Sequence, residues 1–570
     1  MRSSSAAGCV RAREIIEPAY GVVALMKRYR ALGAGILLAS FAMTVGEPAR
    51  GATRGTYVID ERPALLSYDD LVELASPRPW GPDLEGRLET LLSTPFVNNE
   101  AFYRGAEPFR PVEPGLQEVM RVVSWNIEQG LRFDLIRALF TDDREFRSHL
   151  DRDAALNGKE RRELEREIAM LRSADVLVLQ EVDWGMGRTG YARIAEELGR
   201  ALDMNWAYGV GFVEVDSFNL GIEELAGVAA GQRAETRRGI GVDEARYEGL
   251  QGIVVLSRYP IRSARLLPLR AQAYDWFADE IKKVSLVESA KRKASETLFI
   301  NRIGRQIRLG GRTLLVVELD VPDLPLGAVT IAATHLESRA DPAGRREQIA
   351  EVLSYLGDIP HPVVLAGDMN TSSRDGTPTS WKREVSRRAA DESFWISQGL
   401  KYASGLGVVL DLVSGGIGLL RTHTDPSVAN IPVVSPNDER GFFKLLENFR
   451  FADGGAFDFR GDRTRALNGA GRTLANSNER DLKGFAATFE AERTVVHNGK
   501  FKLDWIFVKA FATDARDREA SYRFAPHCGR TMEILNKSVA PRLSDHAPIT
   551  VDLPLGVPGG RSVCSVGGES

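Results

Sequence analysis

Carboxylates, carboxamides and histidines follow or sit within several apolar runs of this sequence. The run VVLAGDMN ends on Asp368 and Asn370, and SWNIEQG carries Asn126 and Glu128. The same pattern gives Glu181 in LQEVD, His335 in ATHLES, Asp504 in KLDWIF, and Asp545 and His546 in LSDHAP. Such groups are costly to bury unless something satisfies them. Oxygen-rich groups of this kind suit a hard divalent cation such as Mg²⁺ or Mn²⁺, which leaves room for phosphate oxygens and water.

Each motif on its own also has an ordinary structural explanation. Asn126 could end a strand, Glu181 could lie on the surface, and His335 could be a hydrogen-bonded structural histidine. Asp504 could pair with a neighbouring lysine, and the tripeptide SDH occurs by chance in many chains. A joint site is favoured because five such elements occur in one sequence, each tied to a predicted strand. Rigid strand ends place catalytic groups accurately.

The segments that would position these residues alternate between strand-like and helix-like patterns, as in an α/β or α+β domain. Residues 175–182 (DVLVLQEV) are too continuously apolar for an exposed strand, so we expect them inside a sheet. Further strands are predicted at 121–127, 252–261, 313–321, 328–336, 362–370, 502–509 and 547–553. Helices are predicted near Leu84–Leu92 and over residues 144–172.

The chain of 570 residues divides into segments of different character. We expect residues 1–54 to be a leader, 55–118 a preface that packs on the main domain, and 556–570 a flexible tail. Residues 119–555 form the domain that carries the motifs. Within it, residues 211–250, 275–312 and 374–500 are rich in glycine or charge, and we predict that they are inserted loops or lids.

Composition narrows the function classes. Hydrophobic residues make up 43% and charged residues 27%, which is normal for a globular protein, and the formal net charge is −4. The net charge therefore does not indicate a protein that binds duplex nucleic acid. A locally basic groove remains compatible with this charge. Cys9, Cys528 and Cys564 lack zinc-like or redox spacing, which argues against thiolate chemistry. Whether Cys528 and Cys564 pair is left open.

The N-terminal region has the pattern of a secretory signal over about residues 26–51. Lys27, Arg28 and Arg30 precede the apolar run 31–46, and small residues follow it. The run is shorter than the ~20 residues that span a bilayer. We therefore expect an exported protein, secreted or periplasmic. The pattern begins late in the chain, and one explanation is that translation starts at Met26. A buried helix and an uncleaved membrane anchor are the alternatives.

The insertion around residues 281–308 is predicted to be a basic helix. Its basic residues are Lys282, Lys283, Lys291, Arg292, Lys293, Arg302, Arg305 and Arg308. A solvated amphipathic helix is the ordinary interpretation. The alternative is a basic wall that steers a polyanion or an anionic lipid surface toward the site. No obligate protein partner is evident.

From Arg121 to Leu553 the ordered motif set resembles the endonuclease/exonuclease/phosphatase superfamily. That superfamily includes DNase I-like nucleases, AP endonucleases, neutral sphingomyelinases and inositol polyphosphate 5-phosphatases. The resemblance implies a four-layered α/β sandwich, with two mixed sheets packed face to face and helices outside. It also implies that residues 119–555 are a catalytic domain that hydrolyses a phosphoester with a divalent metal, usually Mg²⁺. The motifs are specific for the superfamily and not for any branch.

The resemblance also implies a metal group. Glu181 matches the principal metal carboxylate, and Asn126 matches the amide beside it. Glu128 falls where some members carry a second acid, and Asp545 would complete or support the metal shell.

The resemblance implies a catalytic and substrate-binding group as well. Asp368 matches the carboxylate that takes a proton from the attacking water or orients it, and Asn370 matches the amide that holds a phosphate oxygen. His546, hydrogen-bonded to Asp504, matches the terminal histidine. His335 matches a histidine that contacts phosphate or the leaving group in the DNase I-like and sphingomyelinase-like branches, and it argues mildly against the AP endonucleases.

The sequence therefore predicts an exported, metal-dependent phosphodiesterase, nuclease-like, acting on nucleic acid or a phospholipid headgroup. Alternative activities are those of a sphingomyelinase or phospholipase C, or of a phosphomonoesterase acting on a lipid or inositol phosphate. The segment KLDWIFVK stands where the 5-phosphatases carry a WTDRIL-like element, which counts against that branch. A binding protein that keeps the fold without the chemistry is disfavoured, because no expected acid or histidine is missing.

Overall fold

The structure is a computed structural model, and it describes only part of the chain. The described residues are 56–76, 78–150, 156–217, 219–222, 242–281, 306–371, 439–459, 480–481, 484–490, 500–512, 522–558 and 564. The predicted leader and signal segment, and most of the predicted C-terminal tail, lie outside them. No helix within these ranges is long and apolar enough to cross a membrane.

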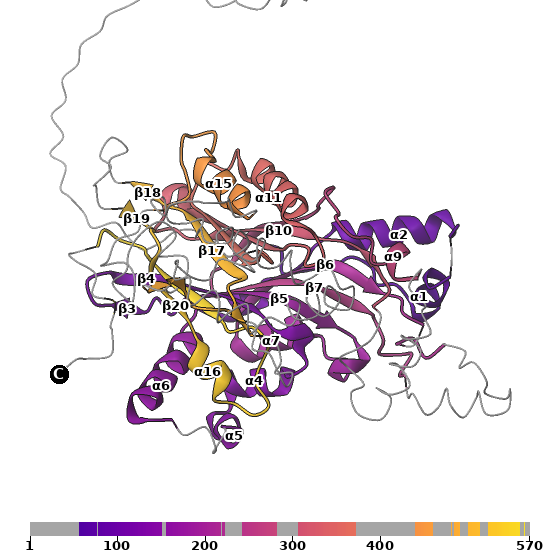
Figure 1. The fold of residues 1–570 in the computed structure, drawn as a ribbon, viewed down its shortest axis with the longest axis horizontal. Coiled ribbons are helices and arrows are strands. Elements are labelled where there is room, and N and C mark those ends of the chain that lie inside the picture. The colour runs from indigo at the N-terminus through magenta and orange to yellow at the C-terminus, as the bar shows by residue number, and fades with distance from the viewer. Residues whose placement is uncertain are drawn as a thin grey trace, which may run out of the picture. The chain divides into compact units, whose positions relative to one another are not determined.

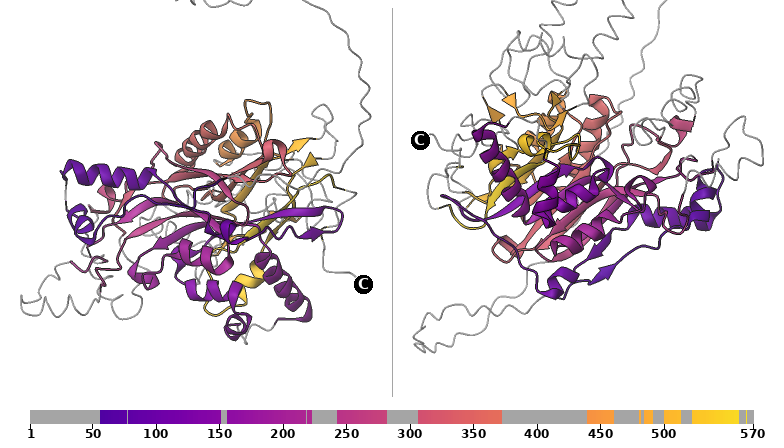
Figure 2. Two further views of the ribbon diagram at one scale, coloured as in Figure 1. Left: turned by 180° about the vertical axis from the view of Figure 1, so that it is seen from behind. Right: turned by 90° about the horizontal axis from the view of Figure 1, so that it is seen from below.

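Two mixed β-sheets pack face to face in the unit Thr56–Ser570, and helices cover their outer faces (Figures 1 and 2). The layer between the sheets is largely apolar and includes Val178, Ile331, Ala333 and Val364, all fully buried. Strands that are buried on both faces must be apolar on both faces, which explains the continuous hydrophobic runs. The predicted four-layered α/β sandwich is confirmed.

The larger sheet has ten strands among the described residues. Its order is β1 (Asp60–Glu61), β2 (Phe96–Asn98), β6 (Asn205–Glu214), β7 (Leu250–Ser257), β5 (Val176–Trp184), β4 (Gln117–Asn126), β21 (Ile549–Pro554) and β20 (His527–Thr531). In addition, β3 (Val112–Glu113) pairs with β4, and β9 (Arg308–Gly310) pairs with β6. The parallel pair β4 and β5 lies near the middle of the sheet.

The smaller sheet has five strands in the described part of the chain. Its order is β17 (Asp504–Lys509), β12 (Val363–Asp368), β11 (Ala328–His335), β10 (Thr313–Asp320) and β8 (Ile261–Pro268). Asp368 lies in register with His335 on one side and with Asp504 on the other. Gly367, at φ +147°, makes this pairing feasible, because a Cβ there would lie 1.8 Å from the Thr334 carbonyl oxygen. The register thus brings three chemically active residues to one end of the sheet.

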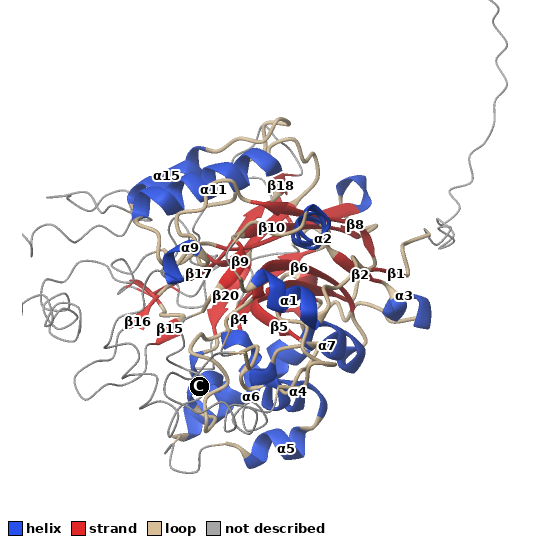
Figure 3. Ribbon diagram, turned by 90° about the vertical axis from the view of Figure 1, so that its right-hand side faces the viewer, coloured by secondary structure: helices blue, strands red, loops and turns tan. Residues whose placement is uncertain are grey.

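Helices pack on both outer faces, as Figure 3 shows with helices in blue around strands in red. Helices α1 (Tyr68–Leu74), α2 (Pro82–Ser93), α4 (Phe133–Thr141), α5 (Asp143–Ser148), α6 (Gly158–Arg172), α7 (Ile194–Leu202) and α16 (Glu533–Lys537) add apolar residues to the core on the larger sheet. Helices α11 (Pro342–Leu356) and α15 (Arg440–Asn448) pack on the smaller sheet. Asn157 begins α6 with a capping box that also uses Glu160, which satisfies the first helical N–H groups.

The remaining described elements are short. They are α3 (Glu100–Arg104), α9 (Ala278–Ile281), the 3₁₀ turns η1 (Glu128–Gly130), η2 (Gly187–Thr189) and η3 (Pro325–Gly327), and the two-residue strands β13 (Arg480–Asp481), β14 (Gly484–Phe485), β15 (Phe489–Glu490), β16 (Lys500–Phe501), β18 (Phe511–Ala512) and β19 (Tyr522–Arg523). A disulfide joins Cys528 of β20 to Cys564, 36 residues later, which answers the question that the sequence left open.

Two predicted elements are wrong as single elements. The helix expected over 144–172 is divided into α5 and α6, and between them Leu150 forms a β-bridge with Val539. The strand expected over 252–261 is also divided, because β7 ends at Ser257 and β8 begins at Ile261 in the other sheet. In both cases the sequence pattern is continuous, although the segment changes its packing partner within that pattern.

The predicted insertions are also partly wrong. The first residues of the segment 211–250 continue β6, a strand that the sequence did not predict. Arg308, expected on a basic helix, instead opens β9 and is buried. β9 forms because backbones meet closely there: a Cβ on Gly310 would lie 2.2 Å from the Gly211 carbonyl oxygen. The other basic residues of that predicted helix lie outside the described residues.

Candidate active site

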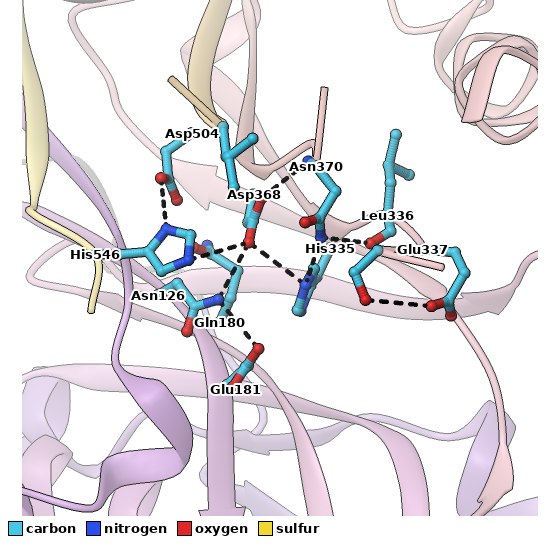
Figure 4. Close-up of polar contacts among 12 residues, drawn as sticks. Asn126, Gln180, Glu181, His335, Leu336, Glu337, Asp368, Asn370, Asp504 and His546 are labelled. Atoms are coloured by element: carbon cyan, nitrogen blue, oxygen red, sulfur yellow. Dashed lines mark hydrogen bonds and ion pairs between the residues drawn. The ribbon is translucent and has the colours of Figure 1, made fainter. Parts of the chain in front are cut away.

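The predicted site residues come from both sheets and meet at one end of the sandwich (Figure 4). The larger sheet provides Asn126 at the end of β4 and Glu181 within β5. The smaller sheet provides His335 and Asp368 at the ends of β11 and β12, and Asp504 at the start of β17. Asn370 follows β12, and Asp545 and His546 precede β21. The structure therefore brings together residues that are more than 400 positions apart in the chain.

Glu181 lies in a bulge of β5. The pairing of β5 with β7 shifts between Leu179 and Val182, and Glu181 has a φ of +53°. A bulge of this kind breaks the alternation of a strand and turns one side chain in a new direction. The Glu181 side chain is only partly buried, and its Oε1 accepts a hydrogen bond from Asn126 Nδ2 at 3.2 Å.

Asn126 connects the two sheets. Its Nδ2 group also donates to Oδ2 of Asp368 at 3.2 Å, and its Oδ1 accepts from the backbone N–H of Glu128 at 3.1 Å. One amide thus holds a carboxylate from each sheet. Glu128 itself lies in the turn η1 directly after β4.

Asp368 lies between two histidines. Its Oδ2 is 3.5 Å from Nε2 of His335 and 3.7 Å from Nε2 of His546. Its Oδ1 accepts the backbone N–H of Asn370 at 2.9 Å. Burial raises the pKa of Asp368 to about 7, with repulsion from Asp504 adding to the effect and the charge of His546 opposing it. Near neutral pH this carboxylate can therefore both accept and release a proton.

The two histidines carry different charges. Burial lowers the pKa of His335 well below its usual value, and the charge of Arg312 adds to the shift. The Nδ2 group of Asn370 donates to Nε2 of His335 at 3.0 Å, which fits a neutral ring. Burial alone would lower the pKa of His546 too, but Asp504 and Asp368 outweigh it and raise that pKa well above the usual value. His546 is therefore the cationic partner of Asp368.

Asp504 and His546 form a buried pair. Nδ1 of His546 lies 2.8 Å from Oδ2 of Asp504, and both residues are at most 5% exposed. Lys502 does not pair with the Asp504 carboxylate; its Nζ donates to the backbone carbonyl of Asp504 at 2.6 Å.

The loop before β21 is fixed by hydrogen bonds to β4. Trp125 Nε1 donates to the His546 carbonyl at 2.9 Å, and Ser544 Oγ donates to the Asn126 carbonyl at 2.7 Å. The His546 N–H in turn donates to Ser544 Oγ at 3.0 Å. The sequence reasoning did not identify Ser544 or Trp125 as supports, although both lie beside motif residues.

Two further supports come from the predicted 374–500 insertion. Thr488 Oγ1 accepts the backbone N–H groups of Leu503 and Asp504 at 2.9 and 3.2 Å. The Thr488 carbonyl accepts the Ala547 N–H at 2.7 Å, and the Phe489 ring lies 4.9 Å from the His546 ring. This segment holds the Asp504–His546 pair on one side, and no motif in the sequence indicated it.

Glu181 and Asp545 are the carboxylates that best fit a metal ion. Asp545 is partly exposed, and neither of the two forms an ion pair with any described residue. Burial raises the pKa of Asp545, and repulsion by Glu181 adds to the shift while His546 opposes it. Two neighbouring carboxylates that share no ion pair with a described residue are a donor set that suits a hard divalent cation.

A second grouping is less suited to a metal. Ligand atoms of Asp368, Asp504 and His546 all lie within 4.8 Å of one another. The Asp504 and His546 atoms already share a hydrogen bond, and a cationic imidazole has no lone pair to offer. This grouping is therefore better suited to proton transfer, whereas Glu181 and Asp545 could hold a metal ion, with Asn126 hydrogen-bonded to the Glu181 carboxylate.

Comparisons with known proteins identify a family. A sequence model described as "Endonuclease/Exonuclease/phosphatase family" matches residues 123–546. No curated protein matches the sequence.

Many solved structures are similar. An endonuclease/exonuclease/phosphatase from Beutenbergia cavernae is 17% identical, with a TM-score of 0.31, over 78% of this chain and 73% of that one. A humanized D. rerio TDP2 is 12% identical, with a TM-score of 0.32, over 76% and 98%. The 3′ phosphatase NExo from Neisseria, bound to a product DNA hairpin, is 12% identical, with a TM-score of 0.33, over 76% and 99%. At these identities and scores, the sequence model carries more weight, and its match spans every residue of the candidate site.

Proposed function

Since the chain belongs to the endonuclease/exonuclease/phosphatase family and is a metal-dependent phosphoester hydrolase, we propose that its substrate is a phosphodiester, cleaved in a nuclease-like reaction by attack of water. The observation that carries this proposal is the arrangement of Asp368 between a neutral His335 and a cationic His546. A diester needs both a base for the incoming water and an acid for the departing alkoxide.

Each side chain of the candidate site has a separate role in the proposed reaction. Asp368 orients the water and takes its proton at Oδ2, because its raised pKa matches neutral pH. His546 offers a positive charge and an N–H at Nε2, and Asp504 holds that ring in one tautomer. We assign contact with the phosphate oxygens to Asn370 and His335, whose side chains are hydrogen-bonded to each other.

Glu181 and Asp545 would hold the divalent cation, which we propose is Mg²⁺ or Mn²⁺. When bound, the cation offsets charge on the phosphate oxygens and polarises the ester bond. Glu128, next to Asn126, belongs to the same proposed metal group.

The test is a hydrolysis panel with the purified protein. Plasmid DNA, RNA, sphingomyelin, an inositol polyphosphate and bis-p-nitrophenyl phosphate are each offered with Mg²⁺, Mn²⁺ or EDTA. We expect metal-dependent cleavage of a nucleic acid or of the simple diester, and a loss of it in Asp368→Asn. Cleavage of phosphomonoesters alone would contradict the diester assignment. Cleavage of sphingomyelin alone would show that the substrate is a lipid headgroup and not a nucleic acid.

We also propose that the protein is exported. The basic residues before the apolar run 31–46 support this, and so does the Cys528–Cys564 disulfide, because disulfides persist in oxidising compartments.

A further inference from the structure

A buried arginine lies against two aromatic rings beside the candidate site. The Arg308 guanidinium carbon is 4.3 Å from the ring centroid of Phe212 and 4.0 Å from that of Trp276. Its Nη1 donates to Oε1 of Gln251, and the residue is only 6% exposed. The two rings meet edge to face at 75°, and their contacts limit the movement of the guanidinium.

The charge of Arg308 is not balanced by an ion pair. The neighbouring arginines are balanced: Arg312 pairs with Glu337 at 2.9 Å, and Arg188 pairs with Asp183 at 2.6 Å. Arg308 has no such carboxylate among the described residues, and its Nε is buried without a hydrogen-bond partner there.

The carboxylate on the adjacent strand compensates this charge only in part: it raises the pKa of Arg308 but forms no ion pair with it. Glu214 lies opposite Arg308 in the pairing of β6 with β9, and burial raises its pKa to about 7. Burial also lowers the pKa of Arg308 to about 10, so the guanidinium is charged at neutral pH. A buried cation without a partner is costly, whereas one that meets an anion is not.

Arg308 lies close to the groups that would handle the scissile ester. Its partner Gln251 lies opposite Asp183, next to the β5 bulge that carries Glu181. The Glu181 carboxylate raises the pKa of Arg308, and the charge of Arg308 lowers the pKa of His335. Arg308 thus borders the same end of the sandwich as the metal carboxylates.

We propose that Arg308 binds a second phosphate of the substrate, adjacent to the ester that is cleaved. This inference rests on the proposed phosphodiesterase function and names its substrate class: a nucleotide chain with more than one phosphate. The planar guanidinium fork matches phosphate oxygens in two parallel hydrogen bonds, and the edge formed by Nε and Nη2 makes no hydrogen bond with any described residue.

The experiment compares two substrates that share one diester. One is a thymidine dinucleotide without terminal phosphates, and the other is the same dinucleotide phosphorylated at both ends. We expect the wild-type kcat/KM to be about tenfold higher on the phosphorylated substrate, as for one hydrogen-bonded charge pair. Arg308→Met should bring this ratio close to one, and Arg308→Lys should keep part of it.

Arg339→Met is the matched control. Arg339 also stacks on Trp276, at 4.6 Å, but it is largely exposed and pairs with Glu280 at 2.9 Å. Its substitution should leave the ratio at the wild-type value. A wild-type protein that prefers neither substrate would overturn the proposal, and so would an Arg308→Met protein that retains the wild-type ratio.

A binding measurement separates this proposal from the proposed function. Inorganic phosphate is titrated in EDTA, and the Tm of each protein is recorded. We expect phosphate to raise the Tm of the wild type and of Arg339→Met, but not of Arg308→Met. If no diester is cleaved and the Tm response still depends on Arg308, the anion site is supported and the proposed phosphodiesterase function is refuted. If phosphate raises the Tm equally in all three, Arg308 is a structural residue and the proposal fails.

Discussion

The Asp504 carboxylate holds the His546 imidazole from behind: Oδ2 lies 2.8 Å from Nδ1, while Nε2 on the other side of the ring points toward Asp368. Asp504 belongs to the smaller sheet, and His546 precedes a strand of the larger one. The pair is therefore formed only when the two sheets are packed together.

The first prediction concerns this pair as a unit. If Asp504 acts through His546, then Asp504→Asn and His546→Ala should each cost nearly as much as the double variant. We expect a coupling above roughly 1 kcal/mol, as for residues in direct contact. The measurement is a double-mutant cycle in kcat/KM with saturating Mg²⁺, on whichever ester is cleaved. Additive losses would show that the two residues act separately.

The second prediction concerns the metal carboxylate. Glu181→Gln keeps the shape of the side chain and removes its charge, so metal-dependent turnover should fall by roughly 10²-fold or more. The increase in Tm that Mg²⁺ gives the wild type should vanish as well. Glu128→Gln is made in parallel, because only an equal loss would place Glu128 among the ligands. A folded Glu181→Gln protein with normal turnover would refute the metal assignment.

The third prediction concerns Glu214 and pH. Burial raises the pKa of this carboxyl to about 7 in the folded protein, whereas the unfolded value is near 4.5. Between these values the folded state binds more protons than the unfolded state, so the contribution of Glu214 to stability falls as pH rises from 4.5 to 7. Glu214→Gln removes the charge and should raise the unfolding free energy by up to about 3 kcal/mol above pH 7, with little effect near pH 4.5.

Thermal unfolding at pH 5 and pH 8 measures this difference. Glu89→Gln, the same substitution on the exposed face of α2, serves as the control. A Glu214→Gln protein with the same change in Tm at both pH values would contradict the prediction.

The fourth prediction concerns the disulfide. Because the bond closes a loop of 36 residues, Cys528→Ser should lower the unfolding free energy by up to about 4 kcal/mol under oxidising conditions. With dithiothreitol, the wild type and the variant should unfold at similar denaturant concentrations. Denaturant unfolding monitored by tryptophan fluorescence gives both values. Equal stability of the two proteins without reductant would exclude a stabilising bond.

The fifth prediction concerns location. Expression from Met26 should yield an exported product that has lost its N-terminal segment, as shown by cell fractionation and N-terminal sequencing. A version with Lys27, Arg28 and Arg30 replaced by glutamine should be exported less well. A full-length product retained in the cytosol would contradict the signal interpretation.

The sequence predicted the local parts of the site well. Asn126, His335 and Asp368 each end an apolar run, and each run is a buried strand. Local pattern is sufficient there, because a strand buried on both faces is mostly apolar and each of these polar groups stands where its strand ends. Strand β6 was missed because Gly209 and Gly211 make its pattern weak. These glycines permit close backbone contacts, such as that of the Gly209 carbonyl with Gly252.

The partners of the site could not be predicted in the same way. Thr488 reaches Asp504 across the inserted segment, and Arg308 meets Trp276 only because β9 joins the larger sheet. These contacts depend on long-range packing, for which the surrounding sequence carries no periodic signal. The sequence therefore indicated the polar groups that the structure brings together, and it missed the residues that hold them in place.

The apolar layer between the sheets has a mechanical consequence. Dispersion contacts among side chains such as Val178, Ile331 and Val364 have no fixed direction, so they resist separation of the sheets more than they resist sliding. Asn126 with Asp368, and Asp504 with His546, span that layer and depend on its alignment. If one sheet slid past the other by about 1 Å, the fold would remain intact but both contacts would be lost. On heating, turnover should therefore decline before the protein unfolds, and Ile331→Val, far from any reacting group, should widen that gap.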